Sequence, residues 1–257
     1  MSVVAIWAGA IPAVAALALA AWGVCTARRN AGLVDIFWSL FFLVAAAAFA
    51  FATPWTQRGA LVAALVAVWS LRLAAHLAIR NWSAPEDRRY RAIRARNEPG
   101  FAWKSLYLVF GLQATLAWLV AAPLAAAIAG AAPLGAIDIA GAGLSAAGIA
   151  IEAIADAQLA RFKAKPANEG RVMDRGLWRY SRHPNSFGEF CIWWGLYAIA
   201  LGAGGAWTIF SPLLMTLLLL KVSGVALLEK DIGARRPAYR EYVQSTNAFF
   251  PGPRRAP

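Results

Sequence analysis

The chain has 257 residues, of which 60% are hydrophobic and 15% are charged, and its formal net charge is +12. Its mean hydropathy of +0.54 exceeds what a soluble domain usually carries, so the composition excludes an ordinary soluble protein and predicts a membrane protein. The excess of basic residues invites a nucleic-acid interpretation, but their distribution along the chain argues against one.

Seven apolar runs can be counted against the roughly 20 residues that a helix needs to cross a bilayer. They cover residues 4–24, 33–52, 59–79, 104–122, 133–155, 187–203 and 206–228, and a tail follows at 229–257. The first run lacks a basic n-region and a small-residue cleavage pattern, so we expect a retained helix rather than a signal peptide. The Ala- and Gly-rich stretch 124–150 indicates close helix packing in lipid. The sequence therefore predicts an all-α integral membrane protein, with a single seven-helix domain over residues 1–257.

Basic residues crowd some of the expected connections and avoid others. They gather at 28–29, 80–104, 161–182 and 230–255, whereas 53–58, 123–132 and 203–206 contain only Arg58. Because Lys and Arg are enriched in cytoplasmic loops, this alternation places the N-terminus outside and the C-terminus in the cytoplasm. The basic connections are also long and interleaved with aromatic residues, Tyr90 and Trp178 among them, so we expect function on the cytoplasmic side.

Polar residues within the apolar runs are costly in hydrocarbon and usually face a cavity or a partner. On five of the seven predicted helices they fall at the same depth, in the inner half. They are Asp35 and Trp38, then Trp69, Arg72 and His76, then Glu152 and Asp156, then Asn185 and Glu189, and finally Lys221 and Glu229. Within each of the first four sets the spacing places the residues on one helix face. We therefore predict a single polar chamber that opens to the cytoplasm.

Taken alone, each of these residues also has an ordinary structural interpretation. Asp35 can merely neutralise Arg72, and His76 can be a hydrogen-bonded packing residue. Asp156 and Glu229 lie at helix ends, where charged residues commonly meet the membrane interface. The coincidence of depth across five helices, rather than any single residue, favours a functional site.

The predicted inner loops contain many more arginines than lysines, which favours bidentate capture of phosphates or carboxylates. These arginines are Arg80, Arg88, Arg89, Arg91, Arg94, Arg96, Arg171, Arg175, Arg179 and Arg182. Some of these arginines are explained by the enrichment of Lys and Arg in cytoplasmic loops and by contact with anionic lipid. No GxGxxG or GxxxxGK[ST] nucleotide motif is present in a suitable context, and no HExxH or CxxC predicts a metal site.

Four stretches of the sequence together carry a family resemblance. They are "DIFWSL", "SLRLAAHLAIRNW", "GLWRYSRHPNSFGEFCIWWG" and "LLEKDIGARRPAYREYVQSTNAFFP". With them the chain resembles bacterial members of the membrane steroid 5α-reductase family, of the DUF1295 type. The resemblance implies seven helices that enclose NADPH from the cytoplasmic side of the bacterial inner membrane. It also implies reduction of the carbon–carbon double bond of a Δ4-3-oxo steroid or a similar lipophilic enone.

The resemblance assigns cofactor positions residue by residue. Asn185 and Glu189 match the family's N-x-x-G-E stretch, which lies beside the nicotinamide, and Asp156 matches an acidic cofactor residue. Arg171 matches a phosphate-contacting arginine upstream of "GLW", and Lys221 matches a basic position on the last helix. The other cofactor positions that we expect are Arg72, Arg89, Arg179, Arg182, His183 and Glu229.

The resemblance transfers catalytic roles less directly. Mammalian relatives hold the 3-oxo group with a Glu and with a Tyr on the next helix, where this chain offers Asp35 and either Trp69 or His76. Hydride transfer to the β-carbon pushes charge onto the carbonyl oxygen, which needs a donor, and a proton must reach the α-carbon. We expect Asp35 to donate directly or to orient His76 or Trp69, and Asp35 and Trp38 to bind the substrate. The implied partners are a steroid-like small molecule and membrane lipid, without nucleic acid, and the oligomeric state stays open.

Two other classes remain open. The "RHPxxxG" element and "PAYREY" also resemble membrane methyltransferases of the isoprenylcysteine carboxyl type, which use S-adenosylmethionine. Against this alternative stand "DIFWSL", seven spans, Glu189 four positions after Asn185, and more arginines than a cofactor without phosphates requires. A transporter or lipid-binding protein would explain the buried charges but not the match to "SRHPNSFGEF".

Overall fold

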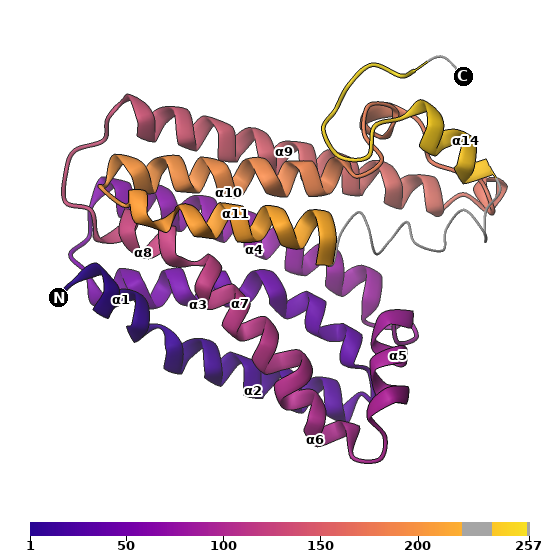
Figure 1. Ribbon diagram of the computed structural model, residues 1–257, viewed down its shortest axis with the longest axis horizontal. Helices are drawn as coiled ribbons and strands as arrows, with labels where there is room; N and C mark the ends of the chain where they lie inside the picture. The colour runs from indigo at the N-terminus through magenta and orange to yellow at the C-terminus, as the bar shows by residue number, and fades with distance from the viewer. Residues whose placement is uncertain (223–237, 256–257) are drawn as a thin grey trace. The chain divides into compact units, whose positions relative to one another are not determined.

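The computed structural model describes residues 1–222 and 238–255, and every regular element among them is a helix (Figure 1). The chain divides into two compact units, each of which is described by itself below. Unit 1 comprises Met1–Asp138 and Ile199–Ser211, and unit 2 comprises Ile139–Ala198 and Pro212–Pro257. The single domain expected over the whole chain stays a prediction.

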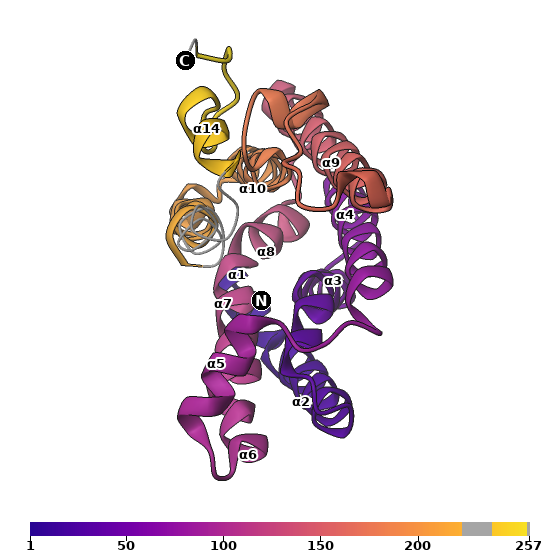
Figure 2. The ribbon, with the colours of Figure 1, turned by 90° about the vertical axis from the view of Figure 1, so that its right-hand side faces the viewer.

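Unit 1 is built from apolar helices that turn back on one another. They are α1 (Val3–Gly9), α2 (Ile11–Ala27), η1 (Ala31–Leu33), α3 (Val34–Ala52), α4 (Gln57–Asn81), α5 (Arg88–Asn97), α6 (Phe101–Ser105), η2 (Leu106–Gly111), α7 (Leu112–Val120), α8 (Ala122–Ala129) and η5 (Ala206–Ile209). Helices α3 and α4 pack side by side, and Figure 2 shows them viewed almost end on. Their contact buries Phe42 and Trp69 completely.

Local chemistry explains where several of these helices begin. Thr56 caps α4 by accepting a hydrogen bond from the Gly59 amide at 3.0 Å, which satisfies a donor that the first turn leaves without a helical partner. Proline in the first turn begins both α2 and α8, because a residue at the helix start needs no amide donor. The first expected span is therefore two helices, α1 and α2, joined at Ala10.

A buried ion pair holds the start of α4 in unit 1. The Arg58 guanidinium donates to both carboxylate oxygens of Asp138, at 2.7 and 3.0 Å, and also to the carbonyls of Ala132 and Pro133. The side chains of Arg58 and Asp138 are each only 1% exposed. The one basic residue of the connections expected on the outer side is therefore neutralised within the protein.

Unit 2 contains most of two long helices and the loops around their ends. Its elements are α9 (Ala136–Lys163), η3 (Pro166–Asn168), η4 (Gly176–Arg179), α10 (Pro184–Gly202), α11 (Phe210–Leu217), η6 (Leu218–Val222) and α14 (Ala238–Ser245). Small residues bring α9 and α10 together. A Cβ on Gly188 would lie 2.6 Å from the Gly148 carbonyl oxygen, and a Cβ on Gly195 would lie 2.5 Å from the Gly141 carbonyl oxygen. Close packing of the Ala- and Gly-rich stretch is thus confirmed for α9.

Among the described residues, five segments are long and apolar enough to cross a membrane. They are Val3–Ala27, Ala31–Ala52, Gln57–Asn81, Phe101–Ala129 and Ala136–Lys163, and they correspond to the first five expected spans. The expected span 187–203 falls within α10, and the expected span 206–228 begins with the shorter apolar helix Ala206–Lys221. The chain is therefore a helical membrane protein, while its seven spans and its orientation stay predictions.

Candidate functional site

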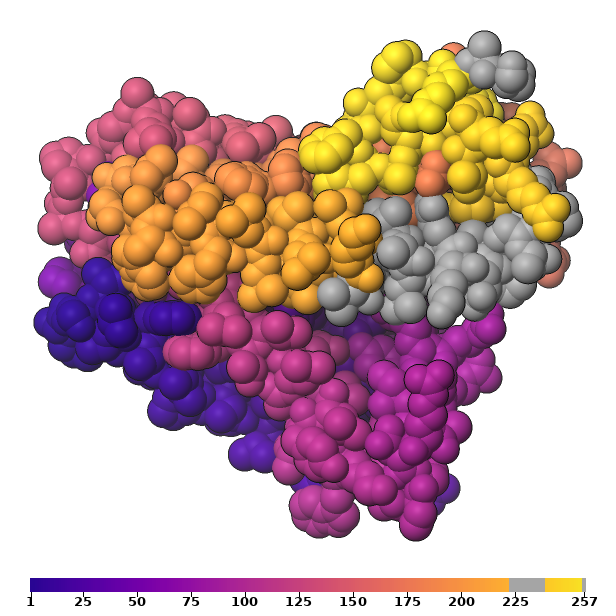
Figure 3. All heavy atoms as spheres, viewed as in Figure 1, coloured from indigo at the N-terminus to yellow at the C-terminus, as the bar shows by residue number. Residues whose placement is uncertain are grey.

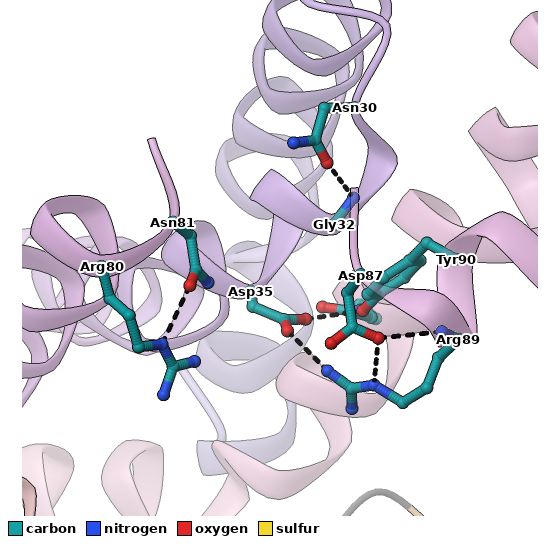
Figure 4. A network of polar contacts seen from close by, with 9 residues as sticks. Asn30, Gly32, Asp35, Arg80, Asn81, Asp87, Arg89 and Tyr90 are labelled. Carbon is teal, nitrogen blue, oxygen red and sulfur yellow. Dashed lines mark hydrogen bonds and ion pairs between the residues drawn. The ribbon is translucent and has the colours of Figure 1, made fainter. Parts of the chain in front are cut away.

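The Asp35 carboxylate is the centre of a polar network in unit 1 (Figure 4). It lies in the first turn of α3, where a negative charge is favoured by the helix dipole. One carboxylate oxygen accepts a hydrogen bond from the Tyr90 hydroxyl at 2.6 Å, and the other accepts one from the Arg89 guanidinium at 3.1 Å. The network therefore joins α3 to the start of α5, and Tyr90 was not among the site residues that the sequence predicted.

Two short loops position this network. Asp87 caps α5 by accepting hydrogen bonds from the Arg89 amide at 2.8 Å and from its Nε at 2.9 Å. Asn30 caps η1 through the Gly32 amide at 3.0 Å. A Cβ on Gly32 would approach the Tyr90 ring to 3.2 Å, so a glycine lets the ring lie close to the backbone at this point.

The Tyr90 hydroxyl is held as a hydrogen-bond donor. Burial, together with the negative charge of Asp35, raises the pKa of Tyr90 well above its ordinary value, so the phenol stays protonated. Gln113 donates to the same oxygen at 3.0 Å. Burial alone would lower the pKa of Arg89, but Asp35 and Asp87 outweigh it and the pKa is raised, so the guanidinium stays charged.

Gln113 lies two residues after the π-helical segment η2, whose extra residue per turn changes the direction in which the following side chains project. Segments of this kind occur frequently at functional sites. No sequence signal marked Gln113, whereas Tyr90 belonged to the aromatic residues of an arginine-rich connection.

Aromatic side chains continue from this network along α3 and α4. The ring of Trp38 contacts Phe42 at a centroid distance of 5.3 Å, and Phe42 contacts Trp69 at 5.5 Å. The Ser39 hydroxyl donates to the Ser70 carbonyl at 2.9 Å, which ties the two helices at this depth. The structure thus brings the two predicted tryptophans into one aromatic group. Arg72 and His76 are half-buried farther along α4, and their roles stay predictions.

Unit 2 brings together two of the predicted cofactor residues. The Asn185 amide donates to the Asp156 carboxylate at 3.3 Å, from α10 to α9. The close glycine contacts of these helices make that distance possible. Asp156 and Glu152 are buried, and Glu189 is half-buried one turn after Asn185.

The loop before α10 forms a basic cavity of about 500 Å³ in unit 2. Its charged and polar lining residues are Gln158, Arg161, Lys165, Asn168, Arg171, Asp174 and Arg175. The loop is fixed to α9, because the Leu177 amide donates to Gln158 at 3.0 Å and the Trp178 indole donates to the Ala155 carbonyl at 3.0 Å. The predicted phosphate residue Arg171 therefore lies among other cations.

Arg182 and its neighbours hold the C-terminal segment, which Figure 3 shows in yellow. The buried Arg182 guanidinium donates to the carbonyls of Val243 and Thr246, at 3.0 and 2.5 Å. The Ser181 hydroxyl donates to the Phe249 carbonyl at 2.8 Å. Arg182 thus anchors the chain as well as being an expected cofactor residue, and that expected role stays a prediction.

The remaining predicted cofactor residues are Arg179, His183, Lys221 and Glu229. His183 is buried immediately before α10, and its amide donates to the Ser181 hydroxyl at 3.1 Å. Arg179 and Lys221 are exposed. Glu229 lies outside the described residues. The predicted single chamber draws on residues of both units and stays a prediction.

These features define a helical membrane protein whose two units each contain clustered polar side chains among the residues that the structure describes. Residues 21–246 match the family model described as "Protein of unknown function (DUF1295)", and the chain belongs to this family. The family is associated with steroid 5α-reductase-like proteins, which confirms the resemblance at this level. No curated protein and no solved structure matches the chain.

Proposed function

We propose that the protein is an NADPH-dependent reductase that acts on the carbon–carbon double bond of a Δ4-3-oxo steroid or a similar lipophilic enone. The observation that supports it most is the protonated Tyr90 hydroxyl, which is hydrogen-bonded to Asp35 and Gln113, with the aromatic side chain of Trp38 three residues after Asp35 on α3. A polar donor beside an apolar aromatic surface suits a flat apolar ring system that carries one carbonyl group.

In this proposal, residues of the chain itself polarise the carbonyl group of the substrate. Negative charge develops on the carbonyl oxygen during reduction, and a preorganised donor at that oxygen stabilises it. The single hydroxyl proton of Tyr90, which bonds to Asp35 in this structure, turns to the carbonyl oxygen when the substrate binds, and Arg89 then compensates the charge of Asp35. The half-buried Trp38 provides the apolar surface for the rings, the buried Trp69 supports it through Phe42, and His76 remains the alternative donor. NADPH, when bound, supplies the hydride for the β-carbon.

The residues of unit 2 fit such a cofactor by their chemistry. Its phosphates need several cations, and the basic cavity offers Arg161, Lys165 and Arg171 within one loop and the adjoining helix end. We assign the phosphates to these residues and the nicotinamide end to Asp156, Asn185 and Glu189. The other expected cofactor residues are Arg72, Arg89, Arg179, Arg182, His183, Lys221 and Glu229. We expect the protein to lie in the bacterial inner membrane, with the proposed site accessible from the cytoplasm.

Tryptophan fluorescence of the purified protein in detergent tests the proposal, because the chain contains 12 tryptophans. We expect saturable binding of NADPH, corrected for absorption by the cofactor, and consumption of NADPH when a Δ4-3-oxo steroid is added. Arg171→Gln should weaken NADPH binding about tenfold. Arg240→Gln, which removes an exposed cation of α14, is the matched control.

The same titration decides among the alternatives. Binding of S-adenosylmethionine without binding of NADPH would overturn the proposal in favour of a membrane methyltransferase. Binding of neither cofactor would favour a transporter or a lipid-binding protein. Binding of NADH without binding of NADPH would still support a reductase. In that case no residue would be needed for the additional phosphate group of NADPH.

A further inference from the structure

A second cavity lies in unit 1, and its lining does not include Asp35, Arg89 or Tyr90. It has a volume of about 410 Å³, and we name it the Arg29 cavity. Its lining residues are Cys25, Thr26, Arg29, Ala31, Arg94, Glu98, Gly100, Phe101, Ala102, Ser105 and Phe110. One part of this lining is apolar and aromatic and the other part is charged, which is the composition that a molecule with an anionic head and an apolar tail requires.

The cavity lies where candidate membrane spans end. The span Val3–Ala27 ends beside it, and the spans Ala31–Ala52 and Phe101–Ala129 begin beside it. Helices α5 and α6 form this end of unit 1, shown in purple and magenta in Figure 3. The cavity therefore opens at the level where hydrocarbon gives way to lipid headgroups.

Aromatic residues around the cavity agree with that depth. Trp103 is 69% exposed, and its ring lies 5.0 Å from that of Trp22, whose indole donates to the Ala102 carbonyl at 2.7 Å. Arg28 donates to the Trp82 carbonyl at 3.0 Å and lies 4.6 Å from the centre of its ring. Exposed tryptophans beside arginines are typical of the membrane interface.

The two arginines of the cavity are placed differently. Arg94 forms an ion pair with Glu86 at 2.8 Å, and its guanidinium lies 4.5 Å from the centre of the Phe101 ring. It also donates to the Arg29 carbonyl at 3.4 Å, so it holds the backbone that carries Arg29. The Arg29 side chain is exposed, and its backbone has a positive φ of 50°. Glu98 brings one negative charge to the same lining.

We propose that the Arg29 cavity binds the phosphate headgroup of an anionic phospholipid, with Arg29 as the main cation and the apolar wall of Phe101 and Phe110 beside the start of an acyl chain. Basic pockets between membrane helices on the side rich in arginine bind lipid headgroups in this way. The alternative source of the same chemistry is a soluble phosphate. The apolar wall and the position at the span ends favour the lipid.

Native mass spectrometry of the delipidated full-length protein tests this proposal. The probes are dioleoyl phosphatidylglycerol, dioleoyl phosphatidylcholine and inorganic phosphate, each titrated separately. We expect phosphatidylglycerol to bind more tightly than phosphatidylcholine, and Arg29→Gln to weaken its first binding event about fivefold. Arg96→Gln, which removes an exposed cation of α5 outside the cavity, should leave this affinity unchanged.

Two further variants keep the test independent of folding. Glu98→Gln removes the negative charge from the lining and should strengthen phosphatidylglycerol binding. Ala102→Phe fills the cavity and should abolish the first binding event while the circular dichroism of the protein is unchanged. Equal affinity in Arg29→Gln and the wild type, or equal affinity for both lipids, would overturn the proposal. Displacement of the lipid by millimolar inorganic phosphate would assign the cavity to a soluble anion instead.

Discussion

The Tyr90 hydroxyl donates a 2.6 Å hydrogen bond to the Asp35 carboxylate, across 55 positions of the sequence. This contact joins an arginine-rich connection to the first turn of α3. It places a neutral donor and a negative charge side by side, and Gln113 donates to the phenol oxygen as well. The two residues therefore form one functional unit in the proposed reaction.

Replacement of Tyr90 by Phe should lower turnover of a Δ4-3-oxo steroid about 100-fold, because the donor to the carbonyl oxygen is removed. NADPH binding, measured by tryptophan fluorescence, should be unchanged. Tyr107→Phe is the matched control, because Tyr107 is 62% exposed on η2. Normal turnover in Tyr90→Phe would contradict the role of the phenol and leave Trp69 or His76 as the donor.

Replacement of Asp35 by Asn tests the partner of Tyr90 separately. The amide keeps the shape but loses the charge that orients the phenol and pairs with Arg89. We expect turnover to fall at least tenfold, with the NADPH dissociation constant retained. The pH profile of turnover should also change, because an ionisable carboxylate is lost. A variant that only perturbs the structure should keep the pH profile of the wild type. If Asp35→Asn retains full activity, the proposed orientation of Tyr90 by a carboxylate is wrong.

The buried pair of Arg58 and Asp138 predicts a large and asymmetric effect on stability. Arg58→Met should lower the free energy of unfolding by about 3–5 kcal/mol, because Asp138 is left as an uncompensated buried charge. The double variant Arg58→Met/Asp138→Leu should recover most of this loss. Unfolding in detergent, followed by circular dichroism, measures both. A double variant that is less stable than Arg58→Met would show that the pair itself, rather than its charges, holds the start of α4.

The glycine contacts of α9 and α10 predict opposite results at two positions. Gly188→Ala should destabilise the protein by about 1–3 kcal/mol, because its Cβ would meet the Gly148 carbonyl and the Glu152 amide. Gly143→Ala on α9 has open space around the new Cβ and should be neutral or stabilising by up to about 1 kcal/mol. Equal melting temperatures of the two variants would argue against this helix contact.

The ion pair of Glu86 with Arg94 predicts that the stability of the protein depends on pH. Burial would raise its pKa, but hydrogen bonds from Arg94 and from the Ala31 amide outweigh burial and lower the pKa below the ordinary value of 4.5. A group whose pKa is lowered on folding stabilises the protein above its unfolded pKa and loses that contribution as the pH falls through the folded pKa.

Glu86→Gln should therefore melt at a lower temperature than the wild type near neutral pH, and the difference should disappear in acid. Melting curves at several pH values, with Glu241→Gln on α14 as an exposed control, measure this difference. If the difference in melting temperature between the wild type and Glu86→Gln grew as the pH falls, the proposed stabilisation by this ion pair would be wrong.

The sequence by itself determined the class of the protein and the approximate position of its first five candidate spans. Apolar length is a local property, so a run such as 59–79 predicts the helix Gln57–Asn81 without reference to the rest of the chain. The close packing of α9 was predictable for a similar reason, because small residues at helical spacing admit a neighbouring backbone. The arginine-rich loops and the resemblance that led to Arg171 and Asn185 were also visible in the residues alone.

Only the tertiary structure decided which distant residues meet. The sequence allows Asp35 to neutralise Arg72, whereas the structure pairs Asp35 with Arg89 and Tyr90 from a separate connection. The sequence predicts Arg182 as a cofactor residue, which stays a prediction, and only the structure shows that it is bonded to the carbonyls of Val243 and Thr246. Helical periodicity fixes which side chains share a face of one helix, but it carries no information about the path of a loop. Such contacts depend on how the loops close over the helix ends and on which buried charges must be compensated there.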